Sequence, residues 1–278
     1  MTMLAPTVQL AHGATMPILG LGTSPMNDTE TERVVADAVQ AGYRLIDTAE
    51  NYGNERGVAA GLRASGVPRA DVFVTTKFNK RWHGADLVRE ALGGSLDRLG
   101  LDYVDLLLVH WPNPGQDRYV DAWRGMAKLL DDGLVRAIGT SNFKPAHLQR
   151  LLDETGVVPD VNQIQLSPLV TRVGSRAFDE QHGIVTESWS PLGGGRNDVL
   201  RVALVDELAR KYAKTPGQVV LRWHVQQGLV PIPKSSNPER LRQNLNVFDF
   251  DLEQTDMDAL SALDQGEASA VDSDKFGH

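Results

Sequence analysis

The stretch of sequence that decides the fold runs from residue 44 to residue 110 and reads RLIDTAENYGNERGVAAGLRASGVPRADVFVTTKFNKRWHGADLVREALGGSLDRLGLDYVDLLLVH. It holds three short apolar runs that alternate with two longer segments of helical periodicity: Arg44–Asp47, Glu55–Ala64, Val72–Lys77, Ala85–Leu99 and Tyr103–His110. An apolar run followed by a helix-length segment is typical of the strand–helix units of a parallel sheet. The stretch therefore predicts three neighbouring parallel strands.

The same alternation continues on both sides of this stretch. Five further runs are predicted as strands: Ile18–Gly22, Val135–Gly139, Val161–Leu166, Ile184–Trp189 and Leu229–Ile232. Six further segments are predicted as helices: Thr29–Gln40, Tyr119–Leu130, Pro145–Leu152, Arg176–Gln181, Val199–Lys211 and Pro238–Asn246. Eight strands that alternate with helices predict an α/β fold of the (β/α)8 TIM-barrel type. An open, doubly wound sheet has the same local pattern, so the number of units leaves that alternative open.

Local signals mark where several of these elements begin. Thr29 and Glu32 have the spacing of a capping box. Thr215 and Asn237 each precede a proline, which suits the first turn of a helix. Before the first strand, the segment Val8–Pro17 has His-Gly at its centre and is predicted to form a β-hairpin that caps one end of the barrel.

Bulk composition limits the class of protein. The 278 residues include 41% hydrophobic residues and no cysteine, and they carry a formal net charge of −8. The acidic balance argues against nucleic acid or an anionic membrane as a partner. The lack of cysteine excludes disulfides and thiolate sites and fits a cytoplasmic protein. Met1–Leu10 lacks the basic and apolar regions of a signal peptide, which supports the same localisation.

The domain organisation is predicted to be simple. No segment rich in proline, glycine or serine divides the chain, so we expect one barrel domain over residues 1–278. The segment 267–278 follows the last predicted element, and we expect it to be loosely ordered.

Three polar residues end the strands of the opening stretch. Asp47, Lys77 and His110 each close an apolar run, one strand–helix unit apart. The carboxyl ends of barrel strands meet at one mouth, where barrel enzymes keep their active sites. Tyr52 follows Asp47 closely enough to fold over the same mouth. Each residue alone also has a structural interpretation. Asp47 could cap a helix, and Lys77 could be a solvated strand end. His110 could be a core histidine, and Tyr52 could anchor a loop. Their common position in the repeat favours catalysis.

These four side chains permit a specific chemistry. Tyrosine is a natural proton donor at neutral pH, because its pKa is about 10. A cation about 4 Å from the phenolate stabilises it by on the order of 4 kcal/mol at an effective dielectric constant of about 20. Lys77 can supply this charge while Asp47 holds it in place, and His110 can orient a carbonyl oxygen. Reduction of that carbonyl also requires a hydride, which indicates a nicotinamide cofactor.

Several strings of the sequence resemble the aldo-keto reductase superfamily. They are GYRLIDTA (42–49), YGNE (52–55), LLLVHWP (106–112), IGTSNF (138–143), VNQ (161–163) and IPKS (232–235). YVDAW (119–123) and NVFDFDL (246–252) are similar to bacterial 2,5-diketo-D-gluconate reductases. The resemblance implies a (β/α)8 barrel that reduces aldehydes and ketones with NADPH. It also implies that Asp47, Tyr52, Lys77 and His110 form the catalytic tetrad.

A candidate anion site follows the eighth strand. Lys234, Ser235, Ser236 and Asn237 precede a predicted helix that contains Arg240. This is the usual phosphate site of the barrel, and free N–H groups at a helix N-terminus favour an anion. The two cations suit an adenosine 2′-phosphate and so favour NADPH. A solvated basic helix start is the alternative interpretation. No G-x-G-x-x-G turn opens a helix after a strand, which argues against a Rossmann dehydrogenase.

The resemblance also assigns the remaining cofactor contacts. The adenosine phosphate would lie against Lys234, Ser235, Arg240 and Asn244. The pyrophosphate would lie beside Ser190, Pro191, Leu192 and Gly193. Trp189 would stack on the nicotinamide ring. Ser141, Asn142 and Gln163 would hydrogen-bond its carboxamide.

The sequence departs from the family pattern around the expected substrate pocket. Ser24 stands where a bulky aromatic residue is common in the family. Asn79, two residues after Lys77, stands where a tryptophan is common. Ser167 stands where a histidine is common. We expect Trp111, Trp82 and Ser24 to line a remodelled pocket. The substrate class is therefore left broad: small carbonyls, α-dicarbonyls or keto-sugars.

Two other functions remain open from the residues. Lys77 could form a Schiff base in an aldolase-like barrel, although its acidic partner opposes the lowered pKa that this chemistry needs. A non-catalytic NADPH sensor could share the barrel. We expect no metal site, because His110 has no second ligand at a metal-like spacing. The expected form is a monomer that acts on a small-molecule carbonyl.

Overall fold

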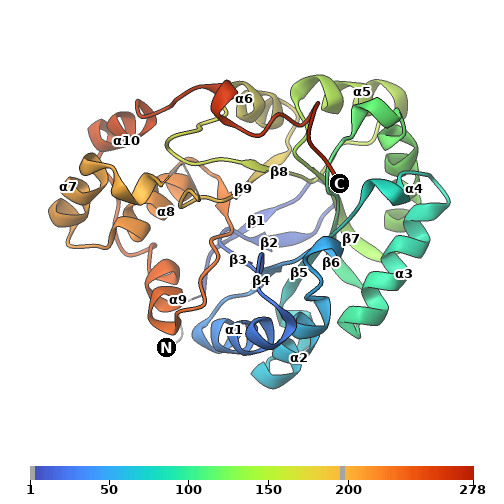
Figure 1. Ribbon diagram of the computed structural model, residues 1–278, viewed down its shortest axis with the longest axis horizontal. Helices are drawn as coiled ribbons and strands as arrows, with labels where there is room; N and C mark the ends of the chain where they lie inside the picture. The colour runs from blue at the N-terminus through green and yellow to red at the C-terminus, as the bar shows by residue number, and fades with distance from the viewer. Residues whose placement is uncertain (1–3, 195–197) are drawn as a thin grey trace.

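Eight parallel strands form a barrel surrounded by helices in the computed structural model, which describes residues 4–194 and 198–278 (Figure 1). The strands are β3 (Leu21–Gly22), β4 (Leu45–Asp47), β5 (Phe73–Phe78), β6 (Val104–Val109), β7 (Val135–Ser141), β8 (Val161–Gln165), β9 (Val185–Trp189) and β10 (Val230–Pro231). Each strand pairs in parallel with its neighbour in chain order. The predicted α/β barrel is confirmed.

The barrel closes between its first and last strands. Gly20 N donates to Pro231 O at 3.1 Å, and Gly22 N donates to Pro233 O at 3.2 Å. A Cβ atom at Gly22 would lie 2.9 Å from the carbonyl oxygen of Ile232, so the close approach requires glycine. These bonds remove the free edges that an open doubly wound sheet would have.

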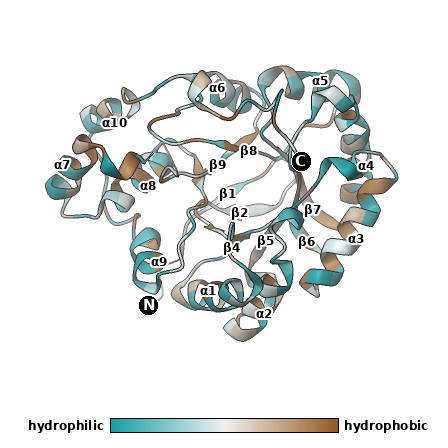
Figure 2. Cartoon of the chain, viewed as in Figure 1, coloured by the Kyte–Doolittle hydropathy of each residue, from teal (hydrophilic) through white to brown (hydrophobic). Residues whose placement is uncertain are grey.

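Helices cover the outside of the barrel. They are α1 (Asp28–Ala41), α2 (Glu55–Ser65), α3 (Leu87–Leu99), α4 (Tyr119–Asp131), α5 (Pro145–Thr155), α6 (Val173–Gln181), α7 (Ala203–Tyr212), α8 (Pro216–Gln226), α9 (Pro238–Leu245) and α10 (Gln254–Ser261). Figure 2 shows both hydrophobic and hydrophilic colour along them, as expected for helices with one face on a sheet. No helix in the described ranges has the length and apolarity needed to cross a membrane.

The predicted hairpin is present at the amino end of the barrel. Strands β1 (Thr7–Gln9) and β2 (Thr15–Pro17) pair antiparallel. His12, in the turn, donates from its backbone N–H to the Asp160 carboxylate at 2.9 Å, and its ring Nδ1 lies 2.9 Å from the other oxygen. The hairpin therefore covers the end opposite the mouth to which the strands point.

Several elements differ from the sequence predictions. Asn27, and not Thr29, is the N-cap of α1, because its side chain accepts from Glu30 N at 2.9 Å. The segment predicted as one helix over 199–211 begins as the 3-10 turn η5 (Val199–Arg201), and α7 starts only after it. Helix α10 was not predicted. Thr215 does cap α8 as expected.

The C-terminal segment, for which we expected loose order, makes defined contacts with the barrel. Lys144 Nζ lies 2.6 Å from carboxylate oxygens of both Asp272 and Asp274. Phe276 packs edge-on against Trp111, with ring centroids 4.9 Å apart. The segment, red in Figure 1, ends inside the ring of helices, on the side of α4 and α5, and carries His278 to the mouth of the barrel.

Candidate active site

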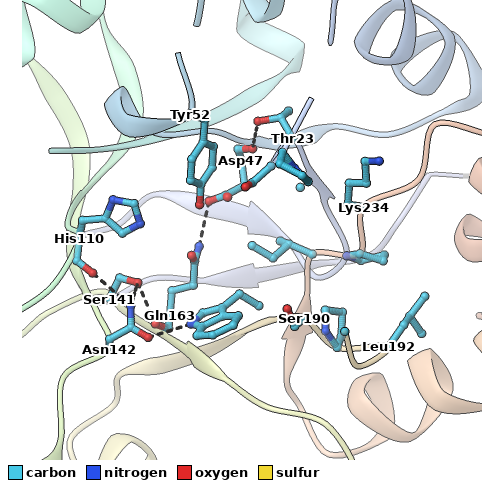
Figure 3. A pocket seen from close by; sticks show the side chains of 18 of the residues that line it. Thr23, Asp47, Tyr52, His110, Ser141, Asn142, Gln163, Ser190, Leu192 and Lys234 are labelled. Carbon is cyan, nitrogen blue, oxygen red and sulfur yellow. Dashed lines mark hydrogen bonds between the residues drawn. The ribbon is translucent and has the colours of Figure 1, made fainter. Parts of the chain in front are cut away.

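One pocket opens at the carboxyl ends of the strands, and the predicted catalytic residues meet there. Asp47 ends β4, His110 directly follows β6, and Tyr52 ends the 3-10 turn η1 (Glu50–Tyr52). All three side chains line a cavity of about 550 Å³. Figure 3 shows them pointing into it from different elements.

Lys77 lies beneath this pocket and connects its members. The side chain is fully buried in β5. Its ammonium donates to Asp47 Oδ1 at 2.7 Å, to the carbonyl oxygen of Thr48 at 2.9 Å and to the Tyr52 hydroxyl at 3.3 Å. An ammonium has three hydrogens, so every one of them has an acceptor.

The electrostatics keep Lys77 charged and Tyr52 protonated. Burial lowers the pKa of Lys77, but the Asp47 carboxylate and Tyr52 outweigh it, and the net pKa is raised. Burial raises the pKa of Tyr52 above its ordinary value, and this effect exceeds the lowering by Lys77. Lys77 therefore lowers the pKa of Tyr52, as expected, but burial decides the net direction of the pKa shift. A phenol that holds its proton before reaction still suits a proton donor.

His110 stands beside Tyr52 as a neutral imidazole. The two rings meet edge to face with centroids 5.8 Å apart. Burial and then the charge of Lys77 bring the pKa of His110 well below its ordinary value. Among the described residues Nδ1 has no hydrogen-bond partner. A neutral imidazole can donate one hydrogen bond to a substrate oxygen without adding charge.

Polar side chains from the carboxyl end of β7 and from the middle of β8 form a second wall of the pocket. Asn142 donates to the carbonyl oxygen of His110 at 3.1 Å and accepts from Trp189 Nε1 at 2.8 Å. Ser141 donates from Oγ to the carbonyl oxygen of Gln163 at 3.1 Å, and Gln163 Nε2 donates to Asp47 Oδ2 at 2.8 Å. These bonds fix the orientation of all three predicted carboxamide partners, and the Asn142 contact holds the indole of Trp189 in place.

The pocket continues from this wall toward Lys234, which Figure 3 places on the opposite side from His110. The half-buried indole of Trp189 lines it, followed along the chain by Ser190, Pro191, Leu192 and Gly193. Such an elongated pocket, with a flat aromatic near the catalytic end and a cation at the other, fits a dinucleotide phosphate.

The anion site after β10 differs in one respect from the expectation. Asn237 Oδ1 accepts from Glu239 N at 2.9 Å and from Arg240 N at 3.1 Å. These N–H groups are therefore not free, and the recognition of a phosphate falls to side chains. Lys234 and Arg240 are exposed, whereas Ser235 and Asn244 are buried.

The structure brings most of the predicted site residues together, but not all of them. Those that line the cavity are Ser24, Asp47, Tyr52, His110, Trp111, Ser141, Asn142, Gln163, Trp189, Ser190, Pro191, Leu192, Gly193 and Lys234. Those outside its lining are Lys77, Trp82, Ser235, Ser236, Arg240 and Asn244. The Trp82 indole donates to Glu50 instead. Of the three departures from the family pattern, only Ser24 lines the cavity; Asn79 and Ser167 do not.

Sequence reasoning missed three polar side chains, two that line the pocket and one that is buried beneath it. Thr23 lines the cavity and donates from Oγ1 to the carbonyl oxygen of Asp47 at 2.9 Å. His278 reaches His110, with ring centroids 4.7 Å apart, from the far end of the chain. Glu187 is buried under Gln163, whose Nε2 donates to it at 2.6 Å. Of these, only Glu187 could have been noticed in the sequence, because it is an acidic residue inside a run predicted as a strand.

Comparisons with known proteins agree with this geometry. Methylglyoxal reductase DkgA of Yersinia pestis is 48% identical over 275 residues, which cover 99% of this chain and 98% of that protein. 2,5-Diketo-D-gluconic acid reductase B of a Corynebacterium species is 49% identical over 261 residues, 94% of each chain. A crystal structure of a Gox0644 mutant in complex with NADPH matches with a TM-score of 0.91 at 43% identity, covering 97% of both chains.

The family assignment follows from these matches together. The model of the aldo/keto reductase family matches residues 16–265, which include every strand of the barrel and the whole lining of the cavity except His278. The chain belongs to the aldo/keto reductase family and is an NADPH-dependent carbonyl-reducing oxidoreductase.

Proposed function

We propose that Tyr52 donates the proton when this enzyme reduces a small aldehyde or ketone to an alcohol. The observation that carries the proposal is the position of the Tyr52 hydroxyl, 3.3 Å from the buried Lys77 ammonium and on the wall of the pocket. Bound NADPH supplies the hydride to the carbonyl carbon. The phenol gives its proton to the carbonyl oxygen, and the phenolate that remains is stabilised by Lys77.

The other three residues have distinct proposed roles. His110 donates a hydrogen bond to the carbonyl oxygen and so orients it toward Tyr52. Asp47 keeps Lys77 charged and fixed, through the 2.7 Å contact between them. Lys77 does not line the cavity, and all three hydrogens of its ammonium group are donated to Asp47, Thr48 and Tyr52. Its proposed role is therefore to stabilise the Tyr52 phenolate and not to contact the substrate.

The Schiff-base alternative is disfavoured by the same contacts. A Schiff-base lysine must present a neutral amine to the substrate. Lys77 is fully buried, and its net pKa is raised. We expect no covalent trapping on Lys77 when substrate and borohydride are added, as judged by intact mass.

The residues proposed to hold NADPH are those around the elongated pocket. Trp189 would lie against the nicotinamide, with Ser141, Asn142 and Gln163 at its carboxamide. Ser190, Pro191, Leu192 and Gly193 would flank the pyrophosphate. Lys234, Ser235, Ser236, Arg240 and Asn244 would hold the adenosine phosphate end.

Reversing the charge at Arg240 tests the phosphate site. We expect Arg240→Glu to weaken NADPH binding by at least about tenfold, since a lost charge-assisted contact of about 1.4 kcal/mol corresponds to that factor. NADH lacks the 2′-phosphate, so its affinity should change much less. Fluorescence titration of both cofactors measures this. Arg242→Glu, on the same helix and also exposed, is the matched control. Equal losses for both cofactors would remove Arg240 from the proposed role.

The substrate class is proposed from the pocket and the relatives. Proteins 48% and 49% identical to this chain are named for methylglyoxal and 2,5-diketo-D-gluconic acid. Ser24, Trp111 and His278 line the cavity, and the rings of Trp111 and His278 pack against His110. We propose that small α-dicarbonyls and keto-sugars enter there. The test is a panel of methylglyoxal, 2,5-diketo-gluconate and aromatic aldehydes, with NADPH oxidation as the readout and Tyr52→Phe as the blank. No turnover with any carbonyl would instead support a non-catalytic NADPH sensor.

We also propose that the enzyme is one domain over residues 1–278 and works as a cytoplasmic monomer. The absence of cysteine fits a reducing compartment. Light scattering coupled to size-exclusion chromatography would test the monomer.

A further inference from the structure

A buried acid that the proposed chemistry does not use lies directly below the active site. Glu187, in the middle of β9, is fully buried. Its Oε2 accepts from Gln163 Nε2 at 2.6 Å, and its Oε1 has no hydrogen-bond partner within residues 4–194 and 198–278. An unpaired anionic oxygen in such a place costs far more than a neutral hydroxyl.

The same amide nitrogen of Gln163 also donates to Asp47 Oδ2 at 2.8 Å. Both amide hydrogens are therefore committed to carboxyl groups, one on β4 and one on β9. Gln163 lines the cavity, so its amide can offer the pocket only its carbonyl oxygen. The two carboxyl groups thus decide which end of this amide faces a ligand.

The charges around Glu187 come from a small set of groups. Two charged groups shift the pKa of Glu187: Asp47 of β4 and Lys77 of β5. An ionised Glu187 in turn raises the pKa of Tyr52 of η1. Its register partners on the neighbouring strands, Gln163 of β8 and Val230 of β10, carry no charge. Lys77 and Asp47 cancel each other, so an ionised Glu187 would leave the network with a net negative charge.

We propose that Glu187 is a positioning residue that stays protonated in the working enzyme, where it fixes the amide of Gln163 and keeps a second negative charge away from Tyr52. Burial raises the pKa of Glu187 to about 8, and the charge of Asp47 contributes in the same direction. The carboxyl group is then neutral at pH 7 and ionises at mildly alkaline pH. An extra negative charge in the network disfavours formation of the Tyr52 phenolate, so it slows reduction.

The consequence for kinetics rests on the proposed role of Tyr52. We expect wild-type kcat/KM for carbonyl reduction to step down about tenfold with a midpoint near pH 8, because a buried like charge is worth that order of effect. Glu187→Gln keeps the shape and the neutral charge. We expect it to retain activity near pH 7, within about threefold of wild type, and to lack the alkaline step. An unchanged step in this variant would overturn the proposal.

A second readout needs neither substrate nor cofactor. A protonated buried carboxyl group shows its own carbonyl stretch in an infrared pH-difference spectrum. Asp179 is a matched control: it is a buried carboxyl outside the pocket lining, bonded to Thr186 and Asn162, with a pKa raised by burial to about 7. In Asp179→Asn we expect one remaining band that titrates near pH 8 and disappears when Glu187→Gln is added.

These two measurements separate the possible failures. The absence of a titrating acid band in Asp179→Asn would overturn the protonated state of Glu187, whether or not Glu187→Gln folds. Full activity of Tyr52→Phe would contradict the proposed proton donor, and the infrared titration would still decide the state of Glu187.

Discussion

Replacing Tyr52 with phenylalanine should lower kcat for carbonyl reduction by at least about a hundredfold, and by up to about ten-thousandfold, which is the usual contribution of a general acid. The substitution removes only the hydroxyl, whose structural role is one hydrogen bond of 3.3 Å from Lys77. Steady-state rates of NADPH oxidation with methylglyoxal would measure the loss.

The control for this variant is cofactor affinity. Tyr52 is not among the residues proposed to hold NADPH, so its affinity should stay within about threefold of wild type, less than 1 kcal/mol. A variant that loses both affinity and kcat would point to a distorted pocket. In that case the loss of kcat could not be assigned to the missing proton.

Replacing Lys77 with methionine should both inactivate the enzyme and destabilise its fold. Asp47 is 2% exposed and would lose its only cationic partner among the described residues. Breaking a buried ion pair from one side costs about 3–5 kcal/mol. We expect a loss of that size in the free energy of unfolding by urea, and kcat reduced at least about a hundredfold because the phenolate loses its cation.

A second substitution separates these two effects. Adding Asp47→Asn to Lys77→Met removes the stranded charge, so the double variant should regain most of the lost stability and none of the activity. Stability that falls further in the double variant would show that the two side chains do not act as a pair. Recovered activity would show that the Lys77 charge is not needed for the reaction.

Much of this site could be predicted because the barrel repeats one simple rule. Asp47, Lys77 and His110 lie at or next to the carboxyl ends of three successive strands, and parallel strands bring these ends to one rim of the barrel. The hydrogen bonds from Lys77 to Asp47 and Tyr52 follow from that spacing. The resemblance to the family added the residues toward the cofactor, which lie on loops that strand periodicity does not place.

The parts that were missed depend on contacts between distant segments. His278 reaches the mouth because the Lys144 contacts and the Phe276–Trp111 pair hold the end of the chain, and no local pattern encodes them. The net direction of the Tyr52 pKa shift depends on burial, which a sequence does not give. The N-cap of α1 was misplaced because Asn27, Asp28 and Thr29 are all acceptable caps.

The central claim is that the proton comes from the phenol that lies beside Lys77. Its most direct test is the single-turnover rate of NADPH oxidation with saturating methylglyoxal, measured in H2O and D2O for wild type and Tyr52→Phe. We predict a wild-type rate that is slower in D2O, because the phenolic proton exchanges with solvent, and a variant rate at least about a hundredfold lower. A Tyr52→Phe rate equal to that of wild type would contradict the account.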